Sequence, residues 1–176
     1  MTKASKNMSI TNTTDVNLNG GGDIRNNIES QDVLTHPSGS YFIFYGRLTK
    51  ADNTAYANAD EIALTNNAIL HLFSRIEYNL SNQLIESLSY PDHATTMLGL
   101  LKYPDDFSKA QGLNQLWYKN TAITAAKADS NGFAARNAYL IQSPTVKGTY
   151  SFRIQLMHIF GFCADYDKIM YGLKTA

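Results

Sequence analysis

The densest apolar stretch of the chain is SYFIFYGRLTK, residues Ser40–Lys50. Its aromatic and β-branched residues are typical of a β-strand, in which alternate side chains point to opposite faces. The two faces consist of Tyr41, Ile43 and Tyr45, and of Phe42, Phe44 and Leu48. Because both faces are apolar, the pattern predicts a strand inside a β-sandwich, covered on both sides.

Two further segments alternate between apolar and polar positions. Within His71–Leu88, the alternation between residues 75 and 80 predicts a strand with one buried face. Ser81-Asn82 is a turn dipeptide, and the QLIESL run after it predicts a returning strand, so the two form a hairpin. Gly148–Phe160 alternates in the same way and predicts another strand.

The segment SYPDHATTMLGLLKY changes to a helical period. Its apolar positions follow the i, i+3, i+4, i+7 spacing of one helical stripe. They are Ala94, Met97, Leu98 and Leu101. The helix is expected to end near Tyr103, because Pro104 disfavours helical geometry in the residue before it. Farther along, Asn131-Gly132 predicts a turn, and GFCADYDKIMYG predicts an irregular or short helical segment.

The pattern divides the chain into two parts. Residues 1–38 are rich in Asn, Thr, Ser and Gly and predict a flexible N-terminal arm, because they cannot bury enough apolar surface to offset ordering. Gly20–Gly22 is interpreted as a hinge, since no strand precedes it and no Gly-Lys-Ser/Thr follows, as a phosphate loop requires. Residues 39–176 predict a mainly β domain, an antiparallel β-sandwich with one or two short helices.

Composition narrows the function. Charged residues make up 17% of the chain, and 15 Lys plus Arg balance 15 Asp plus Glu, so the formal net charge is zero. No Lys/Arg cluster indicates a nucleic-acid interface, and zero net charge permits self-association. Cys163 is the single cysteine, which excludes an internal disulfide framework. The sequence contains no apolar run of membrane-spanning length and no signal-peptide core, and we expect an intracellular protein.

One tetrad suggests chemistry. Tyr103-Pro104-Asp105-Asp106 has the Tyr-x-Asp-Asp form of a reverse-transcriptase site, in which adjacent carboxylates hold catalytic magnesium. Such a site needs a hairpin tip between apolar strands, whereas a helical pattern precedes this tetrad and a polar segment follows it. Pro104 also cannot donate a ladder hydrogen bond. We therefore interpret the aspartates as surface turn residues, with no third carboxylate converging on them.

The other candidate groups also favour structural roles. His36, His71, His93 and His158 show no metal-ligand spacing, and His71 and His158 are interpreted as hydrogen-bonded structural histidines. Cys163 lies between apolar residues and is expected to be a buried, inert thiol. Asp165 and Asp167 lack the spacing of a calcium loop and are expected in a solvated loop or cap. We expect no enzyme, and no catalytic, cofactor-binding or metal-binding residues.

The order of these segments resembles that of a known family. Two stretches are similar to the N-terminal jelly roll of double-jelly-roll major capsid proteins. The first runs from YFIFYGRLTK through NNAILHLFSRIEYNLSNQLI to the leucine-rich helix after Tyr90-Pro91, and the second is FRIQLMHIFGFCADYDKIMYG. The nearest types are those of Polinton/Maverick transposable elements, adintoviruses and virophages. The similarity covers about residues 33–172. The family has another strand after this point and a second jelly roll, so we expect an N-terminal piece with an incomplete sandwich.

The resemblance implies a structural, viral-like function. Subunits of this family self-assemble as homotrimeric capsomers and tile an icosahedral shell, the capsid of the virion, with other capsid subunits as partners. It implies no cofactor and no small-molecule ligand. The alternative is a ligand-binding β-sandwich, for example a carbohydrate-binding module, in which Trp117, Tyr118 and Tyr139 stack on sugars.

Overall fold

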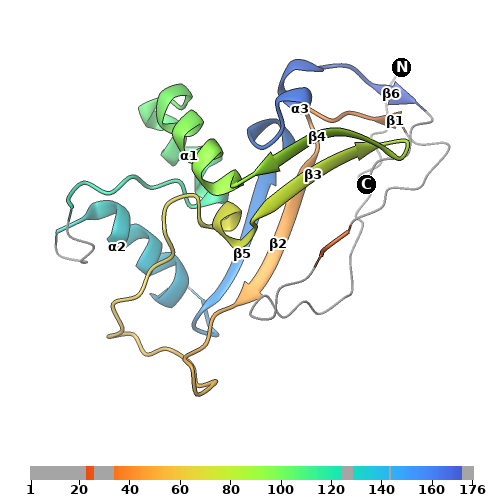
Figure 1. Ribbon diagram of the computed structural model, residues 1–176. Helices are drawn as coiled ribbons and strands as arrows, with labels where there is room; N and C mark the ends of the chain where they lie inside the picture. Colours follow the sequence, from red (N-terminus) through yellow and green to blue (C-terminus); the bar gives the residue numbers. More distant parts are fainter. Residues whose placement is uncertain (1–22, 26–33, 124–128, 143, 172–176) are drawn as a thin grey trace, which may run out of the picture.

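The computed structural model describes residues 23–25, 34–123, 129–142 and 144–171 (Figure 1). Within them, the strands form three two-stranded antiparallel sheets. The pairs are β1 (Leu34–Thr35) with β6 (Met170–Tyr171), β2 (Tyr41–Arg47) with β5 (Thr149–Gln155), and β3 (Arg75–Leu80) with β4 (Gln83–Ser89). The predicted antiparallel pairing of strands is confirmed, while the described residues contain more helical segments than the one or two predicted.

Helical segments fill the connections between the strands. The α-helices are α1 (Pro91–Lys102), α2 (Asn131–Asn137) and α3 (Gly161–Asp165). The 3-10 helices are η2 (Ala68–Leu72), η3 (Asp105–Lys109), η4 (Gln111–Gln115) and η6 (Leu156–His158), and η5 (Ala138–Gln142) is a π-helix. The predicted helix end at Tyr103 and the short helix within GFCADYDKIMYG are both confirmed.

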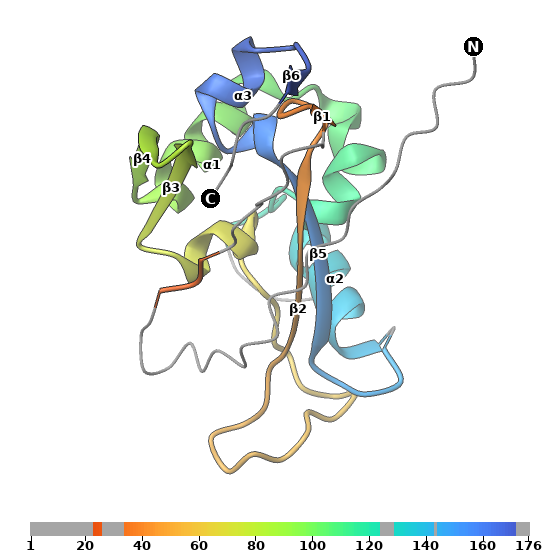
Figure 2. The same cartoon turned by 90° about the vertical axis from the view of Figure 1, so that its right-hand side faces the viewer.

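The β2–β5 ribbon carries the core of the protein. Alternate β5 residues Tyr150, Phe152 and Ile154 are buried, as the period of the segment predicted. They join one cluster with apolar residues of η2, η5 and the segment after β5. In Figure 2 the ribbon runs between the β3–β4 hairpin and α2. Removing a buried ring such as that of Phe152 costs about 3–5 kcal/mol of stability.

The predicted hairpin is confirmed at its turn. Ser81 and Asn82 have φ values of 50° and 64°, and positive φ at both central residues is the signature of a type I′ turn. This turn twists in the same sense as the flanking strands, so it joins β3 directly to β4. A register shift between Tyr78 and Asn79 interrupts the regular pairing. Tyr78 nevertheless points inward, and its ring lies against Phe160.

One face of β2 is open, contrary to the prediction that both faces are covered. Phe42 and Phe44 pack against the core, but Tyr41, Ile43 and Tyr45 are exposed, and the side chain of Tyr45 reaches 76% exposure. The apolar character of a face does not specify which element covers it. Among the described residues, Arg153 lies over this face, with its guanidinium 3.7 Å from the centre of the Tyr41 ring.

The segment around Asn131-Gly132 is a helix start, so the predicted turn there is wrong. Ser130 is the N-cap of α2 and accepts a hydrogen bond from the backbone N–H of Phe133. Gly132 packs directly on the backbone carbonyl of Lys119, where any Cβ would clash. The glycine is therefore present for close packing of the helix, and not for a turn conformation.

The predicted arm is described only in part. Residues 1–22 and 26–33, including the glycine triplet, lie outside the described residues. The last residues of the predicted arm, which the structure does describe, lie against the C-terminal part of the chain. Leu34–Thr35 pair with β6, and Ser38 and His36 both hydrogen-bond Asp167, at 2.7 Å each.

Candidate association surface

Helix α1 packs on the rest of the protein through its small residues. Pro91, Thr95 and Gly99 recur every four positions and are the buried residues of this helix. The side chain of Asn67 donates hydrogen bonds to the hydroxyls of Thr95, at 2.8 Å, and Thr96, at 3.1 Å. Since Asn67 itself is buried in a left-handed conformation (φ 60°), these bonds fix the start of η2 against α1.

At the other end of α1, Gly99 lies against an aromatic cluster. A Cβ on Gly99 would stand 2.5 Å from Cη2 of Trp117 and 2.8 Å from Cε2 of Tyr103. The Tyr103 ring packs edge-on to Trp117 and stacks on Phe107, with centroid distances of 5.0 and 3.9 Å. Glycine is required at this position because the indole comes too close for any side chain.

The first turn of α1 also carries an electrostatic contact. Asp92 lies 3.3 Å from Nδ1 of His71, on η2, and 3.0 Å from Nδ1 of His93. Burial alone would raise the pKa of the Asp92 carboxyl, but hydrogen bonds from His93 and the charge of both histidines hold that pKa below its ordinary value. The predicted structural role of His71 as a paired side chain is confirmed. Within the described part of the chain, no group of three His, Cys, Asp or Glu side chains has the geometry to hold a metal ion.

Three residues of the predicted apolar stripe of α1 face solvent, while the fourth, Ala94, is partly buried. Leu101 is 85% exposed and Met97 is 61% exposed, while Leu98 and Leu100 are each about half exposed. We call these four residues the α1 apolar face. Figure 1 shows α1 projecting at one side of the molecule. Exposed apolar side chains that gather on one side of an anchored helix form a candidate surface for association.

This surface was visible in the sequence only as a periodicity. Met97, Leu98 and Leu101 of the predicted stripe do share the exposed side of the helix, and Leu100, which was not part of the stripe, joins them. The sequence did not predict which side of the helix packs on the protein, because Thr95 and Gly99 carry little apolar area and gave no signal of burial. The ring that Gly99 packs against, Trp117, lies 18 positions farther along the chain, so the helical segment itself gave no sign of this contact.

No family model, curated protein or solved structure matches the chain. The function must therefore be inferred from the described residues themselves. Among these, no helix is long and apolar enough to cross a membrane.

The aspartate tetrad is a surface segment, as predicted. Tyr103 follows the last residue of α1, and Asp105 and Asp106 are exposed in the first turn of η3. The carboxylate of Asp106 lies 2.7 Å from Nζ of Lys109. No third carboxylate converges on the pair within the described residues. The magnesium interpretation therefore has no structural support.

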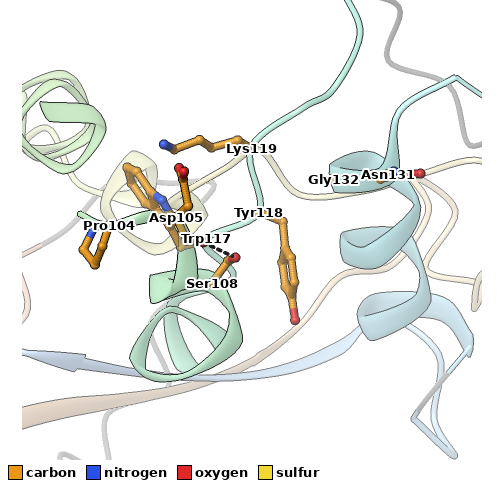
Figure 3. A pocket seen from close by; sticks show the side chains of 8 residues that line it. All are labelled: Pro104, Asp105, Ser108, Trp117, Tyr118, Lys119, Asn131 and Gly132. Atoms are coloured by element: carbon orange, nitrogen blue, oxygen red, sulfur yellow. Dashed lines mark hydrogen bonds between the residues drawn. The ribbon is translucent and has the colours of Figure 1, made fainter. Parts of the chain in front are cut away.

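A shallow hollow lies beside the tetrad (Figure 3). It has a volume of about 250 Å³. Its lining consists of Pro104, Asp105, Ser108, Trp117, Tyr118, Lys119, Asn131 and Gly132. The indole N–H of Trp117 has no hydrogen-bond partner, and the Trp117 side chain as a whole is 1% exposed. An indole buried this deeply presents no ring face on which a sugar can stack.

The remaining aromatic candidates are also engaged within the fold. The hydroxyl of Tyr139 donates to the carbonyl of Ser151 at 2.6 Å and accepts from its N–H at 2.9 Å. The carbonyl of Tyr118 accepts from the buried Arg136 guanidinium, and the Tyr118 ring packs against the core. These contacts disfavour the carbohydrate-binding alternative, which depended on exposed rings.

The last sequence candidates occupy structural positions. Cys163 is fully buried, as predicted, and burial together with the charge of Glu86 raises the pKa of its thiol to about 12, which disfavours the reactive thiolate. His158 is half-buried and hydrogen-bonds the Gln115 side chain, as predicted for a structural histidine. Asp165 and Asp167 are exposed near the end of α3, as expected for a solvated loop or cap.

His36, Ser38 and Asp167 contain the residue types of a hydrolase triad, but in the wrong arrangement. A triad needs the two imidazole nitrogens to face the serine and the carboxylate separately. Here Nε2 of His36 faces both, at 2.9 Å from Ser38 and 2.7 Å from Asp167. Ser38 also donates directly to Asp167, which together with His36 lowers the pKa of that carboxyl. The cluster ties the two ends of the described chain together and does not activate a nucleophile.

Proposed function

We propose that this protein is a structural subunit that associates with copies of itself, with no catalytic role. The α1 apolar face carries the proposal. It consists of four exposed aliphatic side chains on a helix that is fixed by the Asn67 hydrogen bonds and by the packing of Gly99 on Trp117. A rigid face loses little conformational entropy when it is covered, so more of its burial free energy is available for binding.

Charge balance supports the same proposal. With 15 basic and 15 acidic residues, copies of the chain do not repel one another at long range. Near the α1 apolar face, Lys102 is the charged residue of the last helical turn, so the face itself is aliphatic. Interfaces between identical subunits are typically more apolar than other interfaces, which fits a second copy as the occupant.

The fuller form of the proposal is a capsid-type protein. It rests on the resemblance in sequence to the N-terminal jelly roll of double-jelly-roll major capsid proteins, together with this association surface. The chain would then form homotrimeric capsomers of an icosahedral shell and reside in the virion. A jelly roll needs antiparallel strands, and the pairs β2–β5 and β3–β4 supply that pairing. The arrangement of strands into two facing sheets remains part of the proposal.

A pair of matched variants tests self-association. Leu101→Glu places a charge at the most exposed position of the α1 apolar face, and Val146→Glu makes the same change at an exposed aliphatic residue far from it in sequence. Burying a leucine side chain stabilises an interface by about 1.5–3 kcal/mol. We therefore expect Leu101→Glu to weaken association roughly 10- to 100-fold, at about 1.4 kcal/mol per factor of ten.

The measurement is size-exclusion chromatography with light scattering over a concentration series. Wild type and Val146→Glu should form the same oligomer, while Leu101→Glu should shift to a smaller species with unchanged circular dichroism. A trimer mass and particles in negative-stain electron microscopy would support the capsid form. A wild-type chain that stays monomeric at high concentration and forms no particles would overturn the proposal.

A further inference from the structure

Among the described strands, β2 pairs with β5 alone, so its outer edge has no strand partner there. Two hydrogen bonds show which residues of this strand segment point their backbone groups toward β5. Leu48 N–H donates to the carbonyl of Gly148, and Leu156 N–H donates to the carbonyl of Ser40. In an antiparallel pair, residues whose backbones bond the partner alternate with residues whose N–H and C=O point away from it. The even-numbered positions of β2 therefore bond β5. The backbone groups that point outward belong to Tyr41, Ile43, Tyr45 and Arg47.

These outward groups have no partner among the described residues. No backbone or side-chain hydrogen bond reaches the N–H or C=O of any of the four. In Figure 1 this edge is the one turned away from β5, and it faces the viewer in Figure 2. Edge strands in many proteins are blunted by proline, by lysine or by a bulge. The run Tyr41–Arg47 has none of these and pairs with β5 in unbroken register.

The opposite edge of the same ribbon is blocked. On β5 the outward backbone groups of Ser151 are both bonded by the Tyr139 hydroxyl, which acts as donor and acceptor at once. The Tyr139 ring continues inward and stacks on Phe152, 6.2 Å away. Within the part of the chain that the structure describes, one edge of the ribbon is thus closed by a side chain, and the other has no partner.

We propose that the outer edge of β2 pairs with β2 of a second copy, antiparallel and centred on Phe44. The positions with free backbone groups then face one another, so Ile43 lies opposite Tyr45 of the second copy, and Tyr41 opposite Arg47 of the second copy. The side chains of each pair attract one another across the two strands. At the centre an aromatic ring meets a β-branched side chain, and at each end a tyrosine meets a guanidinium. A strand that is complementary to itself about a two-fold axis fits an identical partner.

This pairing rests on the proposed function in one respect, because it takes a second copy as the partner. It uses a different surface, since β2 and the α1 apolar face belong to separate elements (Figure 1). The two contacts together would let each subunit meet two neighbours, as an extended assembly needs. The result would be a four-stranded sheet, β5–β2–β2–β5, across the two-fold axis.

Site-specific cross-linking tests the register. With Tyr45→Cys, the two new thiols lie diagonally across the proposed strand pair, with Cβ atoms roughly 7–8 Å apart. With Tyr41→Cys, they lie roughly 20 Å apart along the strands, at about 3.4 Å per residue. The native Cys163 is buried and has a raised thiol pKa, so it does not react. A short bis-maleimide should therefore trap a dimer of Tyr45→Cys and at least tenfold less of Tyr41→Cys.

The controls separate this proposal from the association through α1. Cross-linking of Tyr45→Cys should persist in a Leu101→Glu background. Two Ile43→Cys thiols also lie diagonally across the proposed pair, and their cross-linking should fall at least tenfold when Tyr45→Lys is added to the same chain. Adding Thr149→Lys instead, on the exposed face of β5, should leave the Ile43→Cys cross-linking unchanged. Equal cross-linking at positions 41 and 45, or none at position 45 while the wild type still oligomerises, would overturn the β2 pairing alone. A dimer cross-linked at position 45 with an oligomeric state insensitive to Leu101→Glu would instead remove the role of α1.

Discussion

The contact between Gly99 and Trp117 gives a sharp test of how α1 is held. In Gly99→Ala, the new methyl would stand 2.5 Å from Cη2 of Trp117 and 2.8 Å from Cε2 of Tyr103. The indole cannot easily move, because its side chain is 1% exposed and packs edge-on to both Tyr103 and Phe107. Overpacking of this kind costs about 1–3 kcal/mol.

Helix propensity acts in the opposite direction. Replacing glycine by alanine in a helix interior stabilises it by about 1 kcal/mol. The net expectation for Gly99→Ala is therefore a loss of about 0–2 kcal/mol in the free energy of unfolding, rather than the gain that an open site would give. Leu101→Gly compared with Leu101→Ala measures the propensity difference at an exposed position of the same helix, and serves as the calibration.

Urea unfolding followed by fluorescence is the assay. Trp117 is the single tryptophan of the chain, so its emission reports directly on the altered contact. We expect a lower unfolding midpoint for Gly99→Ala and a changed emission maximum in the folded state. A Gly99→Ala variant that is more stable by the full calibrated propensity difference would refute the close packing, and with it the outward orientation of the α1 apolar face.

Three further perturbations test separate contacts. Asp92→Asn removes a carboxylate whose pKa is lowered in the folded protein, so wild type should be more stable than this variant above pH 4. The difference between their urea midpoints should shrink as the pH falls below 4. A difference that stays constant with pH would contradict the electrostatic contact. Tyr139→Phe removes both hydrogen bonds to Ser151 and should lower the free energy of unfolding by about 0.5–1.5 kcal/mol per bond. Because the β5 edge opens, light scattering should also show faster aggregation. Unchanged stability and unchanged aggregation would show that the hydroxyl does not close that edge. Cys163 should resist a thiol reagent in the folded protein and react fully in denaturant, and rapid native reaction would contradict its burial.

The sequence predicted where helices, strands and turns form better than it predicted which of their faces are buried. The hairpin turn at Ser81-Asn82 and the end of α1 at Tyr103 depend on backbone preferences of a few neighbouring residues, and both are found. Which side of α1 is buried depends on Trp117, which lies 18 positions beyond Gly99, and no local pattern carries that information. Periodicity identifies an apolar face, but a face can be apolar because it meets the core or because it meets another molecule.

The candidate site shows the same limit. The burial of Cys163 could be predicted from its apolar neighbours in the sequence, because local context decides it. The helix at Asn131 was missed, because an Asn-Gly pair has strong turn preference that the packing of Gly132 on Lys119 overrides. The openness of the β2 edge was missed as well, since it depends on which strands pair and on the distant Tyr139.

The pairing of β1 with β6 has a consequence for how this unit can be connected. Leu34 is the register partner of Tyr171, so the first and last described strands lie side by side, about 5 Å apart. A polypeptide that enters at residue 34 therefore leaves at residue 171 from the same spot. Units whose entry and exit points coincide tolerate insertion into a host loop and circular permutation. Joining residue 171 to residue 34 by a short linker, and opening the chain within the polar loop at residues 51–60, should preserve the β2–β5 core.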